Sequence, residues 1–370
     1  MRYFLFSLGY LTLYGGLHVY AAHRAIQAFP RLRPALVAPL LGALALFPLS
    51  ERLLERGGLW SAPLPLLWVA YVWMGFIFLF VSLLVVSDLM GWCARRISGP
   101  GAVMAKAKTR LGLVFLLAVI LSCQAWLSAQ QPFLAEVEVT SPKVPVSAGE
   151  IRIVQLADIH LGPMLDAKRL DRILAVAIAA RPDLLVSTGD VVDGQLRHIN
   201  GFSGRFAAIP APLGKFAVLG NHEFYVGAAQ SVTFLESAGF TVLRGGSRPV
   251  TGWLTLLGED DAGASHGDTV ATAVSPLRAV PASSFTLLLR HRPTVTADLA
   301  DLQLSGHTHG GQIFPFGLLV RFFFPLPTGL VATGEDKYLY TSLGAGTWGP
   351  PMRLFARPEV TLIRLRHGEG

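Results

Sequence analysis

Residues 151–163 read IRIVQLADIHLGP, and the class of fold can be inferred from this stretch. Ile151–Ala157 is an apolar run whose length and β-branched content are typical of a buried strand. Asp158 and His160 follow it directly. Side chains two positions apart point to the same side of an extended chain. We therefore expect Asp158 and His160 to face a common point at the end of a strand.

Strands and helices alternate through the rest of the chain. Lys168–Ala180 has apolar residues at helical spacing and ends before Pro182, and Gly227–Ala238 is a second predicted helix that ends at Gly239. Further strands are predicted at Leu184–Ser187, Phe216–Leu219, Phe285–Leu289, Leu302–Leu304, Tyr338–Leu343 and Val360–Leu365, with an edge strand at Glu136–Val139. This alternation predicts an α/β domain over residues 131–370.

Acidic, amide and imidazole side chains follow several of these strands. They are Asp158, His160, Asp190, Asn221, His222, His291, His307 and His309. Ligands of open α/β sheets bind beyond the carboxyl ends of the strands, and both cysteines, Cys93 and Cys123, lie outside this domain. A nitrogen and oxygen site for Mn²⁺, Fe²⁺ or Zn²⁺ is therefore predicted, with two ions about 3.5–4 Å apart if a carboxylate bridges them. We expect Gly189, Gly220 and Gly306 to provide sharp turns into the loops.

Residues 1–130 have the composition of a membrane region. The whole chain of 370 residues is 52% hydrophobic and 15% charged, and its mean hydropathy is +0.49. Four apolar stretches approach the length of about 17–25 residues that a membrane span needs. They are Tyr3–Ala22, Pro34–Ser50, Leu64–Ser87 and Leu111–Ala129. The second is short and rich in proline, and the first has the alternative of being a signal peptide. Because His18 is the ionisable group inside a span and Asp88 lies at the end of one, an anchor of about four spans is favoured over a transport path.

The charges are divided unevenly between the two regions. Residues 1–135 hold 11 basic and 3 acidic residues, whereas residues 136–370 hold 20 and 21. The second region therefore lacks the basic surface that binding to nucleic acid requires. With four spans, the first and third loops together carry 8 basic residues against 3 on the other side, which predicts cytoplasmic loops and an extracytoplasmic domain after Ala129. If the second stretch does not span, the tally is 6 against 5 and leaves the side open.

The ordered motifs resemble those of the calcineurin-like metallophosphoesterase superfamily, in its membrane-associated bacterial branch. The motifs are D-x-H at 158–160, G-D-x-x-D at 189–193, G-N-H-E at 220–223, His291, and G-H-T-H-G-G-Q at 306–312. The resemblance implies a four-layer α/β/β/α sandwich and hydrolysis of a phosphoester or pyrophosphate bond by a metal-activated hydroxide.

The same resemblance implies roles for individual residues. Asp158, His160 and His309 would hold one metal, Asn221, His291 and His307 would hold the second, and Asp190 would bridge them. His222 would protonate the leaving group or stabilise the transition state. Asp193 would either orient His222 or simply cap its loop. Protein phosphatases of the superfamily carry Arg-Gly after the residue matching Asp193, but Gly194-Gln195 stand here, which disfavours a phosphoprotein substrate.

An apolar segment, residues 313–327, follows the last motif. We expect it to be an apolar lip that contacts the bilayer or an acyl chain, with Phe314, Phe316, Arg321 and Phe322 as substrate contacts; the alternative is a buried loop. A phosphorylated small molecule or a lipid-linked phosphoester or pyrophosphate is the expected substrate, and no protein partner is evident. The alternatives are a cytoplasmic-facing pyrophosphatase of acylated nucleotide sugars, a nuclease, and a membrane interaction module with a structural metal site.

Overall fold

The computed structural model describes residues 2–56, 62–98, 106–194, 201–261, 280–295 and 300–368. The chain divides into two compact units. Unit 1 comprises residues 1–127 and 349–352, and unit 2 comprises residues 128–348 and 353–370.

Unit 1 consists of long helices. They are α1 (Arg2–Ala28), α2 (Pro34–Arg56), α3 (Leu64–Ser98) and α4 (Ala107–Ala129), the last of which ends at the start of unit 2. By length and apolar composition, α3, α4 and the Pro34–Glu51 part of α2 could each cross a membrane. The proline-rich second stretch is therefore confirmed as a possible span. The first stretch is helical but is not among these three, because Tyr10, Tyr14 and His18 interrupt its apolar run.

Helices of unit 1 are held together by an apolar core and by polar contacts that include a cluster of charged side chains. Tyr14, Ala45, Ile77, Phe80 and Ala118 belong to the shared apolar core. The polar cluster centres on Asp88 of α3, which accepts hydrogen bonds from Tyr20 and Arg24 of α1 and pairs with Arg110 of α4 at 3.0 Å. The end of α1, the later part of α3 and the start of α4 therefore lie at one level of the bundle.

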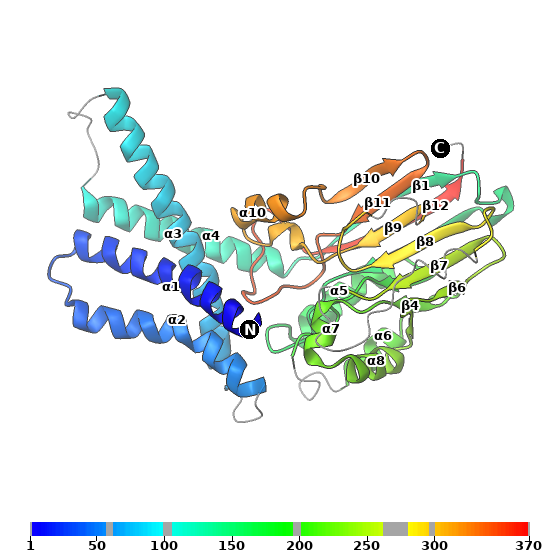
Figure 1. Ribbon diagram of the computed structural model, residues 1–370, viewed down its shortest axis with the longest axis horizontal. Helices are drawn as coiled ribbons and strands as arrows, with labels where there is room; N and C mark the ends of the chain where they lie inside the picture. Colours follow the sequence, from blue (N-terminus) through cyan, green and yellow to red (C-terminus); the bar gives the residue numbers. More distant parts are fainter. Residues whose placement is uncertain are drawn as a thin grey trace. The chain divides into compact units, whose positions relative to one another are not determined.

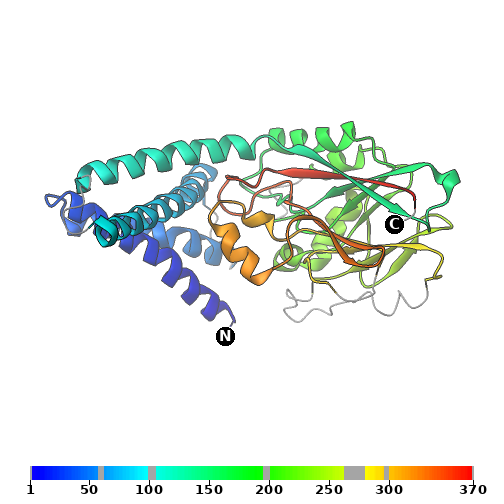
Figure 2. The ribbon, with the colours of Figure 1, turned by 90° about the horizontal axis from the view of Figure 1, so that it is seen from above.

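Unit 2 is built on two six-stranded sheets (Figure 1). The first sheet has the order β1 (Phe133–Ser141), β12 (Glu359–His367), β2 (Glu150–Leu156), β3 (Leu184–Ser187), β4 (Lys215–Ala217), β5 (Thr241–Val242). The second has the order β10 (Gly329–Gly334), β11 (Lys337–Thr341), β9 (Leu302–Ser305), β8 (Phe285–Arg290), β7 (Leu254–Glu259), β6 (Ser247–Pro249). The first and last strands of the unit, β1 and β12, pair in parallel and lie side by side in Figure 2.

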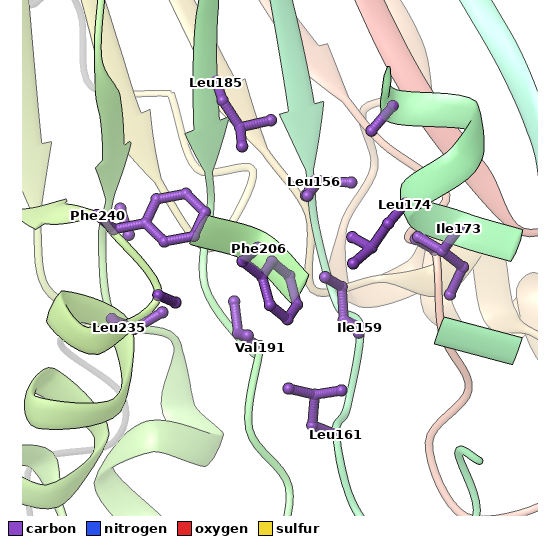
Figure 3. Close-up of a cluster of buried hydrophobic side chains, with 14 of the residues drawn as sticks. Leu156, Ile159, Leu161, Ile173, Leu174, Leu185, Val191, Phe206, Leu235 and Phe240 are labelled. Carbon is purple, nitrogen blue, oxygen red and sulfur yellow. The ribbon is translucent and has the colours of Figure 1, made fainter. Parts of the chain in front are cut away.

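Alternation along the strands builds the layers. Ile153 of β2 and Leu287 of β8 belong to a core shared by the two sheets, so these sheets pack face to face. Val154 and Leu156 point to the opposite face of β2, where the helices α5 (Ala167–Ala179), α6 (Ser203–Ala207) and α8 (Ala228–Ser237) cover the first sheet. Figure 3 shows this second core, with Phe206 of α6 between the strands and helices. The predicted α/β sandwich is confirmed.

Most predicted elements occur within two residues of their expected bounds, and several were missed. Asp166 caps α5, because its side chain accepts a hydrogen bond from the backbone N–H of Arg169. Strands β5, β6, β7 and β10 and the short helices α6 and α7 (Asn221–Val226) were not predicted. The apolar segment 313–327 contains a further unpredicted helix, α10 (Phe316–Phe323), none of whose residues is buried.

Candidate metal centre

Loops at the carboxyl ends of five strands supply the predicted ligands. β2, β3 and β4 are neighbouring parallel strands, and so are β8 and β9. Because parallel strands end at the same edge of a sheet, the residues after them converge. We refer to seven of these residues as the candidate metal centre: Asp158, His160, Asp190, Asn221, His291, His307 and His309.

Potential ligand atoms lie close together in three groups. Each group has its ligand atoms within 4.8 Å of one another: Asp158, His160 and His309; Asp190, His291 and His307; and His160, Asp193 and His222. In the first group, the Nε2 atoms of His160 and His309 are 2.9 Å apart, and His309 Nε2 is 3.9 Å from Asp158 Oδ1.

The second group meets at a single nitrogen. Nε2 of His291 lies 3.0 Å from His307 Nδ1, 3.1 Å from Asn221 Oδ1 and 3.1 Å from Asp190 Oδ2. The same oxygen of Asp190 is 3.9 Å from His160 Nε2 in the first group. Asp190 therefore lies between the two groups, the position that a bridging carboxylate requires.

A divalent cation fits this donor set. Nδ1 of His160 is buried and has no hydrogen-bond partner among the described residues, and its Nε2 faces another imidazole nitrogen. Buried polar atoms without partners are uncommon in folded proteins, and facing lone pairs repel unless a proton or a cation lies between them. Imidazole nitrogens with carboxylate and amide oxygens are the ligands of borderline divalent ions.

Backbone conformation at the centre is unusual. Asp158, His160, Asp190, His307 and His309 all have φ between 49° and 72°, in the left-handed region. Aspartate and histidine are among the side chains that enter this region most often, yet each such residue costs about 1–3 kcal/mol. Strain of this kind persists where the surrounding structure holds the loop for a function. Five of the seven members of the metal centre are positioned this way.

Glycines next to the ligands serve two purposes. Gly189 has a φ of +95°, as expected for a sharp turn. Gly220 has an ordinary φ of −89°, so the expectation of a special turn there was wrong. A Cβ on Gly220 would lie 2.2 Å from Asp190 Oδ1, and one on Gly306 would lie 2.3 Å from Asp158 Oδ2. At both positions the absence of a side chain makes room for a carboxylate.

Glu223 organises the loop that carries Asp190. The fully buried carboxylate accepts hydrogen bonds of 2.7–3.0 Å from the backbone N–H groups of Asp190, Val191, Val192 and Gly220. Its role was not predicted, although it is the last residue of the G-N-H-E motif. The sequence offered one signal for this role, because Glu223 belongs to the motif and lies in the first turn of a short helix.

Arg353 supports the other side of the centre and was also missed. Its buried guanidinium donates to backbone carbonyls that include Gly344 and Gly346, and Nη2 lies 3.0 Å from His309 Nδ1. Burial lowers its pKa to about 9. Nothing near Arg353 in the sequence suggests this role, because its partners are carbonyl groups and not a charged motif.

Burial favours the neutral form of two of the histidines, and charged neighbours favour the ionised form of Asp190. Burial lowers the pKa of His160 to about 3 and that of His307 to about 2, so both imidazoles are neutral near pH 7. Neutral imidazole is the form that binds metal ions. Burial alone would raise the pKa of Asp190, but nearby His291 and His222 outweigh it and hold this pKa well below its usual range. Asp190 is therefore an anion that lies between the two groups of ligand candidates.

His222 stands beside the metal centre with an acidic partner. Its Nδ1 is 2.9 Å from Asp193 Oδ1, and its Nε2 is 4.0 Å from Asp190 Oδ2. This is the geometry that an orienting role of Asp193 requires. Gly194 follows in a left-handed conformation, and Gln195 lies outside the described residues.

The predicted substrate contacts lie on the apolar segment that follows His309. Phe314, Phe316 and Phe322 are 47%, 44% and 80% exposed, and Arg321 is also exposed. Helix α10, which carries Phe316, Arg321 and Phe322, contacts the turn His309–Gly311 that begins with a ligand candidate. Phe324 of the same segment does reach the centre, because its ring lies 5.3 Å from the ring of His307.

Comparison with known proteins agrees with this geometry. A family model described as calcineurin-like phosphoesterase matches residues 151–311. A metallophosphoesterase of Aquifex aeolicus is 38% identical over 260 residues, which cover 69% of this chain and 99% of that protein. This chain belongs to the calcineurin-like metallophosphoesterase family. It is accordingly a phosphoester hydrolase, as its motifs predicted.

Other relatives of this metallophosphoesterase include a protein described as transmembrane. A transmembrane protein with metallophosphoesterase domain from Danio rerio is 31% identical over 258 residues, which cover 65% of this chain and 58% of that protein. A Campylobacter jejuni metallophosphoesterase is 32% identical over 236 residues, 62% of this chain and 63% of that protein. The chain thus spans about six tenths of these two relatives. Together with the apolar helices, the Danio rerio relative supports membrane association.

Proposed function

We propose that this metallophosphoesterase hydrolyses the phosphoester or pyrophosphate bond of a lipid-linked substrate. In this proposal residues 1–130 are the membrane anchor and residues 131–370 are the catalytic domain. The convergence of the seven ligand candidates carries the catalytic part of the proposal. The exposed apolar helix α10, which ends next to the metal centre, carries the lipid part.

Two divalent ions of manganese, iron or zinc would be held by the metal centre. Asp158, His160 and His309 would hold one, Asn221, His291 and His307 would hold the other, and Asp190 would bridge them. Such ions supply Lewis acidity toward water and phosphate oxygens.

His222 would assist departure of the leaving group. Asp193 accepts a hydrogen bond from Nδ1–H of His222 and thereby fixes the orientation of the ring. Nε2 is then the atom that holds a proton for the leaving oxygen, at the side of the centre where Asp190 lies. Asp193 also offsets the positive charge of the protonated ring.

Lipid recognition is assigned to α10 and the residues around it. Leu318, Phe322 and Phe323 are 61%, 80% and 67% exposed. Surface aromatic and aliphatic side chains clustered on one short helix are typical of an element that enters the membrane interface. Phe314, Phe316 and Phe322 would contact acyl chains, and Arg321 in the last turn would lie near headgroup phosphates.

The catalytic domain is proposed to face the extracytoplasmic side of a bacterial inner or cell membrane. The shared contact of Arg24 and Arg110 with Asp88 supports a bundle in which the basic first and third loops lie on one side. Basic loops of membrane proteins favour the cytoplasm. An enzymatic topology reporter fused after Gly370 tests the orientation, and activity of a cytoplasm-dependent reporter would contradict it.

The lipid preference can be measured on the full-length protein. We expect the metal-loaded enzyme to cleave phosphorylated lipids in vesicles faster than a soluble chromogenic ester, because the anchor and α10 keep the centre at the lipid surface. Replacement of Phe322 and Phe323 by serine should lower the ratio of the two rates about 100-fold, since about 1.5 kcal/mol is lost for each of the two aromatic contacts with the membrane.

Val146→Ser provides the matched control, because Val146 is 75% exposed on the turn between β1 and β2. Its ratio should equal that of the wild type. A wild-type enzyme that shows no preference for vesicles would contradict the lipid part of the proposal while leaving phosphoester hydrolysis intact.

A further inference from the structure

Trp348 is an exposed aromatic residue beside His222. Its side chain is 48% exposed, and its ring centroid lies 6.0 Å from that of His222 at an angle of 75°. Tyr225, 42% exposed, places its ring 5.3 Å from the same imidazole. Two exposed rings therefore adjoin the residue to which proton transfer to the leaving group is assigned.

The backbone of Trp348 is held firmly in spite of this exposure. Nε2 of Gln312 donates to the carbonyl of Trp348 at 2.9 Å, and the N–H of Trp348 donates to Oε1 of the same side chain at 2.8 Å. Gln312 is the last residue of the G-G-Q sequence that follows the ligand His309, and the motif assigns it no role at the metal centre. One amide side chain thus ties the Trp348 loop to the ligand loop.

The residues before Trp348 are fixed as well. The N–H groups of Ala345 and Gly346 donate to the carbonyls of Ala157 and Asp158 at 2.8 and 2.9 Å. A Cβ on Gly346 would lie 1.9 Å from the carbonyl oxygen of Ile159, so the two loops touch. The Thr347 hydroxyl accepts a hydrogen bond from buried Arg169. Trp348 is therefore pre-organised against the loop that carries Asp158 and His160.

From this geometry we propose that Trp348 is a specificity-determining contact for a leaving group that carries a flat ring, and that Gln312 is its positioning residue. The inference rests on the proposed function, because it uses the assignment of His222 to the leaving-group side. An immobilised indole stacks on flat apolar faces and loses little entropy on binding. Aromatic rings and the apolar faces of sugar rings both offer such a surface, whereas an unbranched alkyl group does not.

The test compares three esters of one phosphate type that differ only in the leaving group: phenyl, glucosyl and butyl. With the full-length, metal-loaded enzyme, Trp348→Ala should lower the kcat/KM ratio of a ring ester over the butyl ester about tenfold, chiefly through KM. Trp348→Phe should restore most of that ratio. Whether the phenyl or the glucosyl ratio responds identifies the kind of ring.

Gln312→Glu removes the amide N–H that binds the Trp348 carbonyl and should lower the same ratio by a smaller factor. Equal metal content in the three variants excludes loss of the fold as the cause. If Trp348→Ala leaves the kcat/KM ratios of the ring esters over the butyl ester unchanged, the inference is wrong but the proposed function stands. The same conclusion holds if this variant also binds vesicles less well, because the indole then contacts the membrane and not the leaving group. A wild type that cleaves none of the esters would overturn the proposed function and this inference together.

Discussion

The metal centre and helix α10 touch through His307 and Phe324, yet they are built in opposite ways. Asp158 and His291 are 0% exposed. The loops around them are fixed by hydrogen bonds from backbone N–H groups and by the buried side chains of Glu223 and Arg353. Phe322 and Phe323 on α10 are 80% and 67% exposed and pack mainly on each other. The first region is enclosed by other parts of the protein, whereas the second presents its apolar side chains on the surface.

α10 has the kind of exposure that the helices of unit 1 have. Leu13 in α1 and Leu36 in α2 are 74% and 71% exposed, as expected for side chains that meet lipid. In the rest of unit 2, the strands bury their apolar residues between and behind the sheets. In the proposed function, this difference assigns the chemistry to the metal centre and the selection of lipid-linked phosphates to α10.

Asp190→Asn should abolish activity toward soluble and vesicle substrates alike. The change removes the negative charge between the two groups of ligand candidates. Because the metal ions would then stabilise the transition state by several kcal/mol less, kcat should fall at least about 1000-fold. Steady-state rates with both substrates, together with metal content, check this. Full turnover on either substrate would show that Asp190 is not part of the centre.

Asp193→Asn distinguishes an orienting residue from a loop cap. If Asp193 orients His222, kcat should fall about 100-fold while the metal content stays at the wild-type value. If it only caps the loop, the midpoint of thermal unfolding should fall and kcat should persist. Both are measured on the same preparation.

Glu223→Gln should weaken metal binding without touching a ligand. The neutral amide accepts hydrogen bonds less strongly, and its NH₂ group opposes backbone donors, so the Asp190 loop loosens. We expect the dissociation constant for Mn²⁺ to rise about 10–100-fold, the usual effect of residues that support ligands. Titration calorimetry measures it, and an unchanged constant would assign Glu223 to stability alone.

Arg321→Gln tests the contribution of α10 and should have the smallest effect on the rate of cleavage. One basic residue near an anionic membrane contributes about 1 kcal/mol, so cleavage in anionic vesicles should slow about fivefold. Arg321→Lys keeps the charge and should retain the wild-type rate. An equal loss in neutral vesicles would show that Arg321 does not act through headgroup charge.

Sequence motifs predicted the candidate metal centre because each ligand candidate lies within a few residues of the end of a strand. The spacing of D-x-H and G-H-T-H, with His291 after β8, was enough to predict convergence at the sheet edge. The supporting role of Arg353 could not be predicted from the sequence, because its partners are carbonyl groups that only folding brings close to it. Glu223 was visible in its motif, but its four N–H partners come from a loop 31–33 residues earlier in the chain or from its own turn.

Helix α10 was not predicted because the prolines that flank it, and a glycine within it, suggest a segment without regular secondary structure. Pro315 and Pro325 enclose an apolar run that also contains Gly317. In the structure Pro315 is the N-cap of the helix, where its missing N–H has no cost, and Pro325 comes after its end. Gly311 makes room for the start of the helix, because a Cβ on Gly311 would lie 2.2 Å from the Cα of Gly317. The prolines therefore delimit the helix and do not prevent it.

Anomalous diffraction from crystals of the full-length protein soaked in Mn²⁺ would decide whether the seven ligand candidates form a two-metal site. We expect two peaks about 3.5–4 Å apart, one beside Asp158, His160 and His309 and one beside Asn221, His291 and His307, with Asp190 touching both. A single peak, or none, with these side chains turned away from one another would contradict a two-metal mechanism for this enzyme.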